Sequence, residues 1–139
     1  MFNTLLLAVD VNAMDGADRL ARAAKLLAAD ESAEIHVINV VPGSGMNMVG
    51  AAFEGDYNRT ARAGAEKALK TWTDSAFGGR AQVHVTEGNI YDSVLRTADR
   101  IGADVIVVGA HRPELRDYLV GPNAARITRH ANQSVMVIR

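Results

Sequence analysis

Two glycines separated by a short segment are the residues of this chain whose positions point most clearly to a ligand-binding site. Gly109 follows the apolar run Val105–Val108, and Gly121 directly precedes a segment with helical spacing. A glycine at the end of a strand lets the backbone approach a ligand, and a helix N-terminus presents free N–H groups and a positive dipole end. The pattern predicts a loop whose backbone N–H groups converge on a phosphate. Both glycines could instead be simple turn residues, which are common at strand ends.

Basic side chains gather in the same part of the chain. Between residues 112 and 139 the local charge balance is +3, whereas the whole chain has a formal net charge of −1. The contributing residues are Arg112, Arg116, Arg126, Arg129 and Arg139, against Glu114 and Asp117. This balance favours an anionic ligand, although arginines that only solvate the surface would give the same count.

The composition indicates a globular protein and limits its chemistry. The 139 residues are 48% hydrophobic and 22% charged, which predicts one domain spanning 1–139. Without a basic field, we expect no binding to nucleic acid or to an anionic membrane. The absence of cysteine excludes disulfides, thiol catalysis and cysteine-ligated metals. No run is long enough to span a membrane and no signal peptide is visible, so we expect a cytoplasmic location.

Apolar patterning predicts strands that alternate with helices. Strands are predicted at 5–9, 35–41, 83–85, 105–108 and 135–138, and helices at 17–28, 61–76, 89–101 and 124–131. The strands are continuously apolar, as expected when both faces are covered. We therefore predict an α/β fold, a doubly wound five-stranded parallel sheet with helices on both faces. Residues 43–56 are predicted to form a long loop. In such sheets, ligands bind at the carboxyl ends of the strands, where the strand order reverses.

The segment Gly109-Ala-His-Arg112 together with Gly121 resembles the phosphate loop of the universal stress protein family, Gly-x2-Gly-x9-Gly-Ser or Thr. The resemblance covers the whole chain. It includes a first strand ending at Asp10, the sequence Asn39-Val-Val-Pro42 and the closing segment 129–139. The chain resembles one bacterial branch of small, single-domain members, and we identify it as a member of this family.

The resemblance implies a Rossmann-like domain, similar to the adenine nucleotide alpha hydrolases, that dimerises and binds ATP or another adenine nucleotide. Its nucleotide-binding residues would be Ala8, Asp10, Val40, Gly109, His111, Arg112, Gly121, Pro122, Asn123 and Ala124. Asp10 would face the sugar and the base, and the backbone of Val40 would bind the adenine edge. Gly109, His111 and Arg112 would line the ribose and the phosphates. Residues 121–124 would hold the phosphate tail.

The chain departs from the family pattern at three points. Arg112 replaces the middle glycine, the spacer from Arg112 to Gly121 is eight residues instead of nine, and Pro122 replaces the hydroxyl residue. Proline has neither a hydroxyl nor an N–H, and each charge-assisted bond to a phosphate is worth about 1.5–3 kcal/mol. Roughly tenfold or more in affinity could be lost. The N–H groups of Asn123 and Ala124 remain, and Arg112 could add a guanidinium.

Asp10 suits a ribose hydroxyl or a metal, but it could also cap the next helix, with Asn12 and Asp15 as rivals. A lone carboxylate is not a metal site, so any Mg²⁺ would arrive with the nucleotide. No catalytic residue is predicted, because His111 lacks a visible partner that would make it a general base.

Two alternative functions stay open. One is a dimeric interaction protein without nucleotide, favoured by Pro122, and the other is a slow ATP hydrolase using His111 or Asp10.

The last predicted strand is suited to pairing with the same strand of a second copy of the chain. Ser134 to Arg139 contains no proline that would blunt the edge, so we expect a homodimer through this segment. The resulting hypothesis is a cytoplasmic, dimeric, adenine-nucleotide-binding module in stress response or signalling.

The remaining histidines are predicted to be structural. His36 and His84 lie within predicted strands. His130 lies near a helix C-terminus, where a positive charge interacts favourably with the helix dipole.

Overall fold

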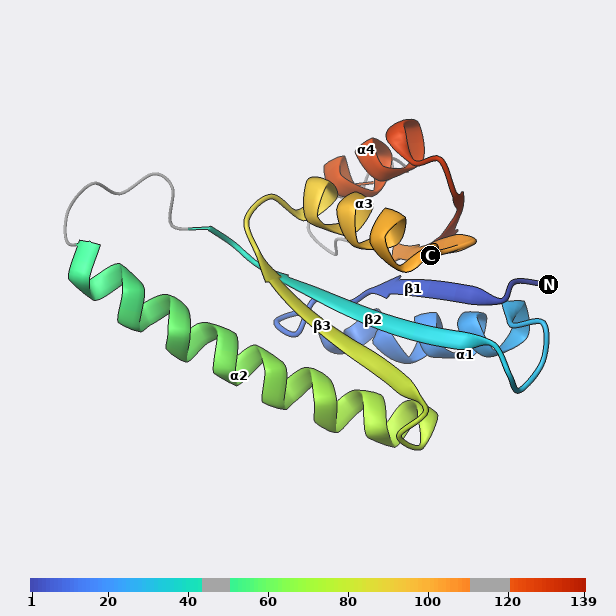
Figure 1. Cartoon of the computed structure of the whole chain (residues 1–139), viewed down its shortest axis with the longest axis horizontal. Coiled ribbons are helices and arrows are strands. Elements are labelled where there is room, and N and C mark those ends of the chain that lie inside the picture. Colours follow the sequence, from blue (N-terminus) through green and yellow to red (C-terminus); the bar gives the residue numbers. More distant parts are fainter. Residues whose placement is uncertain (44–50, 111–120) are drawn as a thin grey trace.

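A computed structural model describes residues 1–43, 51–110 and 121–139, and of residues 51–58 the backbone alone. The elements, in chain order, are β1 (Thr4–Ala8), η1 (Met14–Gly16), α1 (Ala17–Leu27), β2 (Glu34–Val41), α2 (Ala51–Phe77), β3 (Ala81–Glu87), α3 (Ile90–Ile101), β4 (Val105–Gly109), α4 (Pro122–His130) and β5 (Ser134–Ile138). The strands form one parallel sheet in the order β3-β2-β1-β4-β5 (Figure 1). The predicted fold class is confirmed.

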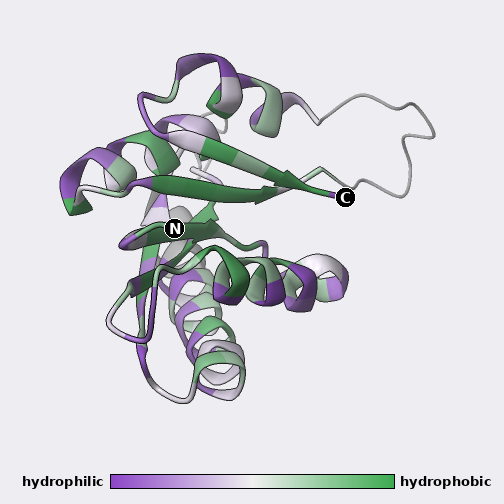
Figure 2. Cartoon of the chain, turned by 90° about the vertical axis from the view of Figure 1, so that its right-hand side faces the viewer, coloured by the Kyte–Doolittle hydropathy of each residue, from purple (hydrophilic) through white to green (hydrophobic). Residues whose placement is uncertain are grey.

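The sheet separates two hydrophobic layers. Leu5 and Leu7 of β1 pack on the side covered by α1 and α2, whereas Leu6 packs on the side of α3 and α4 (Figure 1). Figure 2 shows apolar strands between helices whose outer sides are hydrophilic. Because side chains alternate between the two faces of a strand, a strand covered on both faces must be apolar at every position. This explains the continuous apolar runs in the sequence.

The residues that flank α3 at its two ends are those that the sequence predicts. The side chain of Asn89 accepts a hydrogen bond from the backbone N–H of Asp92 at 3.3 Å, as an N-cap should. Gly102 ends the helix in the left-handed conformation with φ 67°, where a side chain would be strained. Both predictions are confirmed, and they fix how β3 and β4 are joined.

The prediction of a loop over residues 43–56 is partly wrong. α2 begins at Ala51, and residues 44–50 lie outside the described part of the chain. At the start of α2, Ala51, Ala52 and Glu54 favour a helix through their backbone propensity, whereas Gly55 disfavours one. The N-terminal part of α2 extends beyond the sheet (Figure 1), so no core requires an apolar stripe there. Without that stripe, apolar periodicity could not reveal these turns of the helix.

The two strand histidines contact each other. Nδ1 of His36 lies 2.8 Å from Nε2 of His84, and the rings are stacked with centroids 5.1 Å apart. His36 is buried, and its other nitrogen lies 3.5 Å from the carboxylate of Glu34. Burial, followed by the charges of His36 and Arg100, lowers the pKa of His84 below its ordinary value of 6.5.

Because of this histidine pair, we expect acidic pH to lower the free energy of unfolding. Between the lowered pKa of folded His84 and the 6.5 of the unfolded chain, the unfolded state binds more protons. The contribution of His84 to stability should therefore be complete above 6.5 and fall as the pH drops through the lowered pKa. Urea unfolding at a few pH values between about 7.5 and 5.5 measures this decline.

His84→Gln should reduce the decline, because it removes the titrating ring. His130→Gln is the matched control for the loss of one histidine, since that ring lies at the exposed end of α4 and away from the pair, so the part of the decline that comes from His84 should remain in this variant. A full decline in His84→Gln would contradict the interpretation.

Candidate functional site

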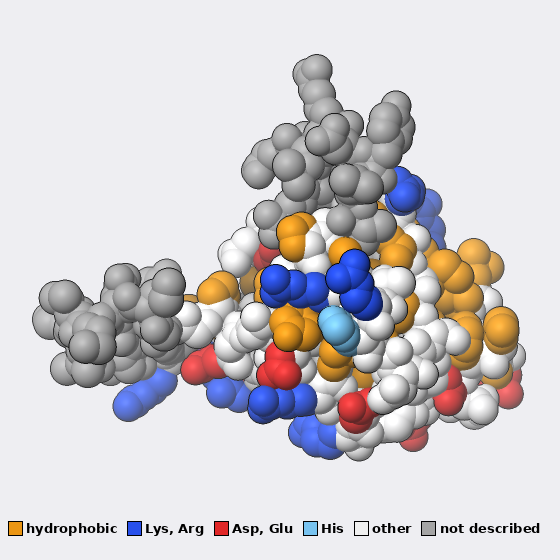
Figure 3. Space-filling model, turned by 90° about the horizontal axis from the view of Figure 1, so that it is seen from above, with side chains coloured by type: hydrophobic (Ala, Val, Ile, Leu, Met, Phe, Trp, Pro, Cys, Tyr) orange, Lys and Arg blue, Asp and Glu red, His pale blue; other side chains and the backbone are white. Residues whose placement is uncertain are grey.

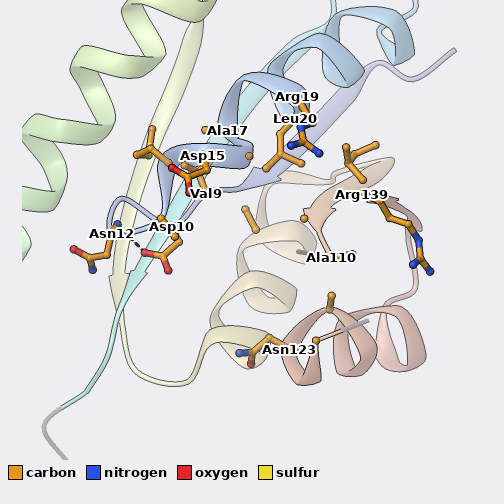
Figure 4. Close-up of a pocket in the computed structure, with 18 of the residues that line it drawn as sticks. Val9, Asp10, Asn12, Asp15, Ala17, Arg19, Leu20, Ala110, Asn123 and Arg139 are labelled. Carbon is orange, nitrogen blue, oxygen red and sulfur yellow. Dashed lines mark hydrogen bonds between the residues drawn. The ribbon is translucent and has the colours of Figure 1, made fainter. Parts of the chain in front are cut away.

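A cavity of about 760 Å³ opens at the carboxyl edge of the sheet, where the strand order reverses between β1 and β4. Four of the described segments line it: the end of β1 with the turn into α1, the end of β4, the start of α4 and the end of β5 (Figure 4). Its size suits a small-molecule ligand. Its position agrees with the general rule for open parallel sheets.

The chain turns sharply after β1, and Asp10 holds this turn. Its Oδ1 accepts the backbone N–H of Asn12 at 2.9 Å, and its carbonyl accepts the N–H of Ala13 at 3.0 Å. Asp10 therefore stabilises its own turn and does not cap α1, whose N-cap is Gly16. Oδ2 of Asp10 makes no hydrogen bond with any described residue, and the side chain is exposed. One carboxylate oxygen is left for a ligand.

A buried amide anchors the same turn from below. Asn39 of β2 is 4% exposed, and its Oδ1 accepts the N–H of Val11 at 3.1 Å. We did not predict Asn39 as a site residue. The available signal was a polar residue inside the apolar run of β2, since buried polar groups need a partner.

The opposite wall is the start of α4. Gly121 is the N-cap and Pro122 occupies the first helical position, which tolerates a residue without an N–H. The first N–H groups of a helix have no partner within it, so those of Asn123 and Ala124 are available at the cavity wall.

The space around the two glycines is open. A Cβ added at Gly109 or Gly121 would meet no atom of a described residue within 4 Å, and neither glycine has a positive φ. The predicted close backbone approach is therefore geometrically possible at both. A left-handed turn at Gly109 is not what the structure contains.

The charges of the cavity are segregated. Asp10 and Asp15 lie in the turn that follows β1, whereas Arg19, further along in α1, and Arg139 lie nearer the end of β5 (Figure 4). Among the residues that the structure describes, no group of three histidine or acidic side chains could hold a metal ion.

Only part of the predicted basic cluster belongs to this cavity. The guanidinium of Arg126 lies over the ring of Tyr91, 5.4 Å from its centroid, and His130 is tilted against the same ring at 6.2 Å. Figure 3 shows basic side chains beside a histidine on this outer face of α3 and α4. Of the described arginines in the cluster, only Arg139 lines the cavity.

Most of the predicted site residues meet in one place. Ala8, Asp10, Gly109, Gly121, Pro122, Asn123 and Ala124 all line the cavity. Val40 is not among its described lining residues, and it packs beside the core under α3 and α4. His111 and Arg112 lie outside the described residues. That these residues bind a nucleotide stays a prediction.

The sequence reasoning missed several lining residues. Asn12 and Asp15 were considered only as helix caps, and Arg19 not at all. Arg139 was predicted to be part of the basic cluster and of the dimer segment, but not to line a ligand site. Helical periodicity marks the buried side of α1, but it does not reveal which exposed residue reaches over the end of the sheet.

None of the helices within residues 1–43, 51–110 and 121–139 combines the length and the apolar character needed to cross a membrane.

Comparison with known proteins places the chain in a family. The model of the universal stress protein family matches residues 1–139. Universal stress protein G of Escherichia coli O157:H7 is 35% identical over 144 residues, with 100% of both chains covered. Universal stress protein UspA from Lactobacillus plantarum has the same fold, with a TM-score of 0.80 at 21% identity over 100% of this chain and 99% of that one.

Two structures with the same fold contain nucleotides. A universal stress protein in complex with cAMP matches with a TM-score of 0.63 at 17% identity, covering 99% of this chain and 97% of the other. The universal stress protein from Archaeoglobus fulgidus in complex with dAMP matches with a TM-score of 0.59 at 21% identity, covering 98% and 97%. On the family model and the sequence identity to universal stress protein G, this chain belongs to the universal stress protein family.

Proposed function

We propose that this protein binds an adenine nucleotide in the cavity between β1, β4 and α4, and acts as a binding module in stress response or signalling. The observation that supports this most directly is the convergence of Gly109, the free α4 N–H groups and the Asp10 carboxylate on one cavity. The complexes of two proteins of this fold with cAMP and dAMP support adenine as the base.

Each part of the ligand has a proposed partner. The free oxygen of Asp10 accepts a ribose hydroxyl, because a carboxylate is a strong acceptor. The N–H groups of Asn123 and Ala124, at the positive end of α4, face the phosphates. The resemblance assigns the adenine edge to the backbone of Val40, which is not among the described lining residues, and the ribose and phosphates to His111 and Arg112, which lie outside the described residues.

Pro122 weakens the hold on the phosphates. At the first position of α4 it contributes neither an N–H nor a hydroxyl, although its fixed φ suits a helix start. We expect the protein to bind nucleotides, with ATP held less tightly than it would be with serine at this position.

Isothermal titration with ATP, AMP and GTP tests the proposal. We expect heats of binding for the adenine nucleotides. Pro122→Ser should tighten ATP about tenfold, because it adds two donors. Pro122→Ala is the matched control, since it adds the N–H without the hydroxyl, and its affinity should be intermediate. No heat and no thermal shift at millimolar ATP or AMP would refute nucleotide binding.

A second measurement separates binding from hydrolysis. Mass spectrometry of nucleotide released by denaturing the purified protein identifies ATP, a hydrolysed product or nothing. Intact nucleotide supports the binding module, and the product would indicate the slow ATP hydrolase.

We propose further that the protein is a homodimer through Ser134 to Arg139. β5 is the last strand of the sheet, paired with β4 on one side only. Val135 and Val137 face the core under α3 and α4, whereas Met136 on the other face is 38% exposed. An apolar edge strand without proline is suited to pairing with a second copy.

Light scattering after size exclusion should give twice the 14.9 kDa mass of one chain. Met136→Lys should give a monomer, because a lysine on an edge strand opposes pairing and two copies would repel. Leu26→Lys is the control: Leu26 is 86% exposed on α1, and this variant should remain dimeric. A wild-type monomer at micromolar concentration would contradict the dimer.

A further inference from the structure

We propose that Arg19 of α1 binds the phosphate groups of the nucleotide and provides donors that Pro122 cannot. This inference rests on the proposed function, because it assigns a residue and a ligand class to the same cavity. It predicts that the protein selects phosphorylated adenine compounds over the uncharged nucleoside.

The first support is the distribution of charge around the cavity. Asp10 and Asp15 lie in the turn that follows β1, and Arg19 lies four residues after Asp15, in α1 and on the side of β5 (Figure 4). Phosphates are repelled by the carboxylates and attracted by the guanidinium. An asymmetric cavity of this kind orients a ligand that has a hydroxyl-rich sugar at one end and an anion at the other.

The second support is that Arg19 is uncommitted within the described chain. Its side chain is exposed, and it makes no hydrogen bond or ion pair with any described residue. The neighbouring Asp18 does not compete for it, because Oδ1 of Asp18 accepts the indole N–H of Trp72 at 3.1 Å. A guanidinium has five N–H donors in a planar fork that matches phosphate oxygens.

The third support is that the opposite wall of the cavity lacks one hydrogen-bond donor. Pro122 removes one of the first N–H groups of α4, whereas those of Asn123 and Ala124 remain on this wall. A phosphate located between these N–H groups and Arg19 would be held from two sides. The cavity volume of about 760 Å³ leaves room for base, sugar and phosphate together.

The experiment compares Arg19→Ala with Arg22→Ala by isothermal titration of adenosine, AMP and ATP. Arg22 is the matched control, since it is exposed on the same helix but does not line the cavity. We expect Arg19→Ala to weaken AMP and ATP about tenfold and to leave adenosine unchanged. Arg22→Ala should bind all three as the wild type does. Arg19→Lys should recover part of the loss, because it keeps the charge without the fork.

The outcomes distinguish this inference from the proposed function. If the wild type binds nucleotides but Arg19→Ala binds them equally well, or loses adenosine to the same degree, the role of Arg19 is refuted and nucleotide binding stands. If the wild type binds none of the three ligands, the proposed function fails and this inference fails with it. Circular dichroism and thermal unfolding of each variant confirm that the fold is intact, and Arg19→Gln replaces Arg19→Ala if that variant unfolds.

Discussion

The complete burial of the three central residues of β1 is the constraint on which the rest of the structure depends. Leu5, Leu6 and Leu7 are 0% exposed, and β1 pairs with β2 on one side and with β4 on the other. A strand in this position requires a helical layer on each face, which α1 with α2 and α3 with α4 supply. The chain must then fill one half of the sheet before it crosses to the other. The strand order reverses between β1 and β4 as a consequence, and the cavity lies at the carboxyl edge at this point.

Polar side chains of neighbouring elements hold both ends of β1. At its start, the carboxylate of Asp104 accepts the N–H groups of Asn3 and Thr4 at 2.8 and 2.9 Å. Beyond its end, Asn39 accepts the N–H of Val11. These bonds satisfy backbone donors at the points where the sheet ladder stops. They also connect the position of the cavity wall to the register of the strands, so the site geometry depends on the core.

The sequence predicted those features that depend on neighbouring residues. The apolar strands, the Asn89 cap and the Gly102 helix end are local patterns, and the parallel sheet follows from their alternation. The contact between His36 and His84 was not predictable in this way. A helix separates β2 from β3 in the chain, and only their register brings the two rings together. The same limit applied to Arg19, because its position depends on how α1 is rotated over the sheet.

Position 122 shows how one residue can favour the fold and disfavour a ligand. At the first position of α4, the fixed φ of proline reduces the conformational freedom that the unfolded chain loses, and the missing N–H would have had no partner within the helix. For the helix, proline is therefore a suitable residue. For an anion at the same helix end, that N–H is one of the few donors available. The two requirements differ because helix stability depends on bonds inside the helix, whereas anion binding depends on the groups that the helix leaves unpaired. A chain with proline here must hold an anion with side chains of other elements or hold it less tightly.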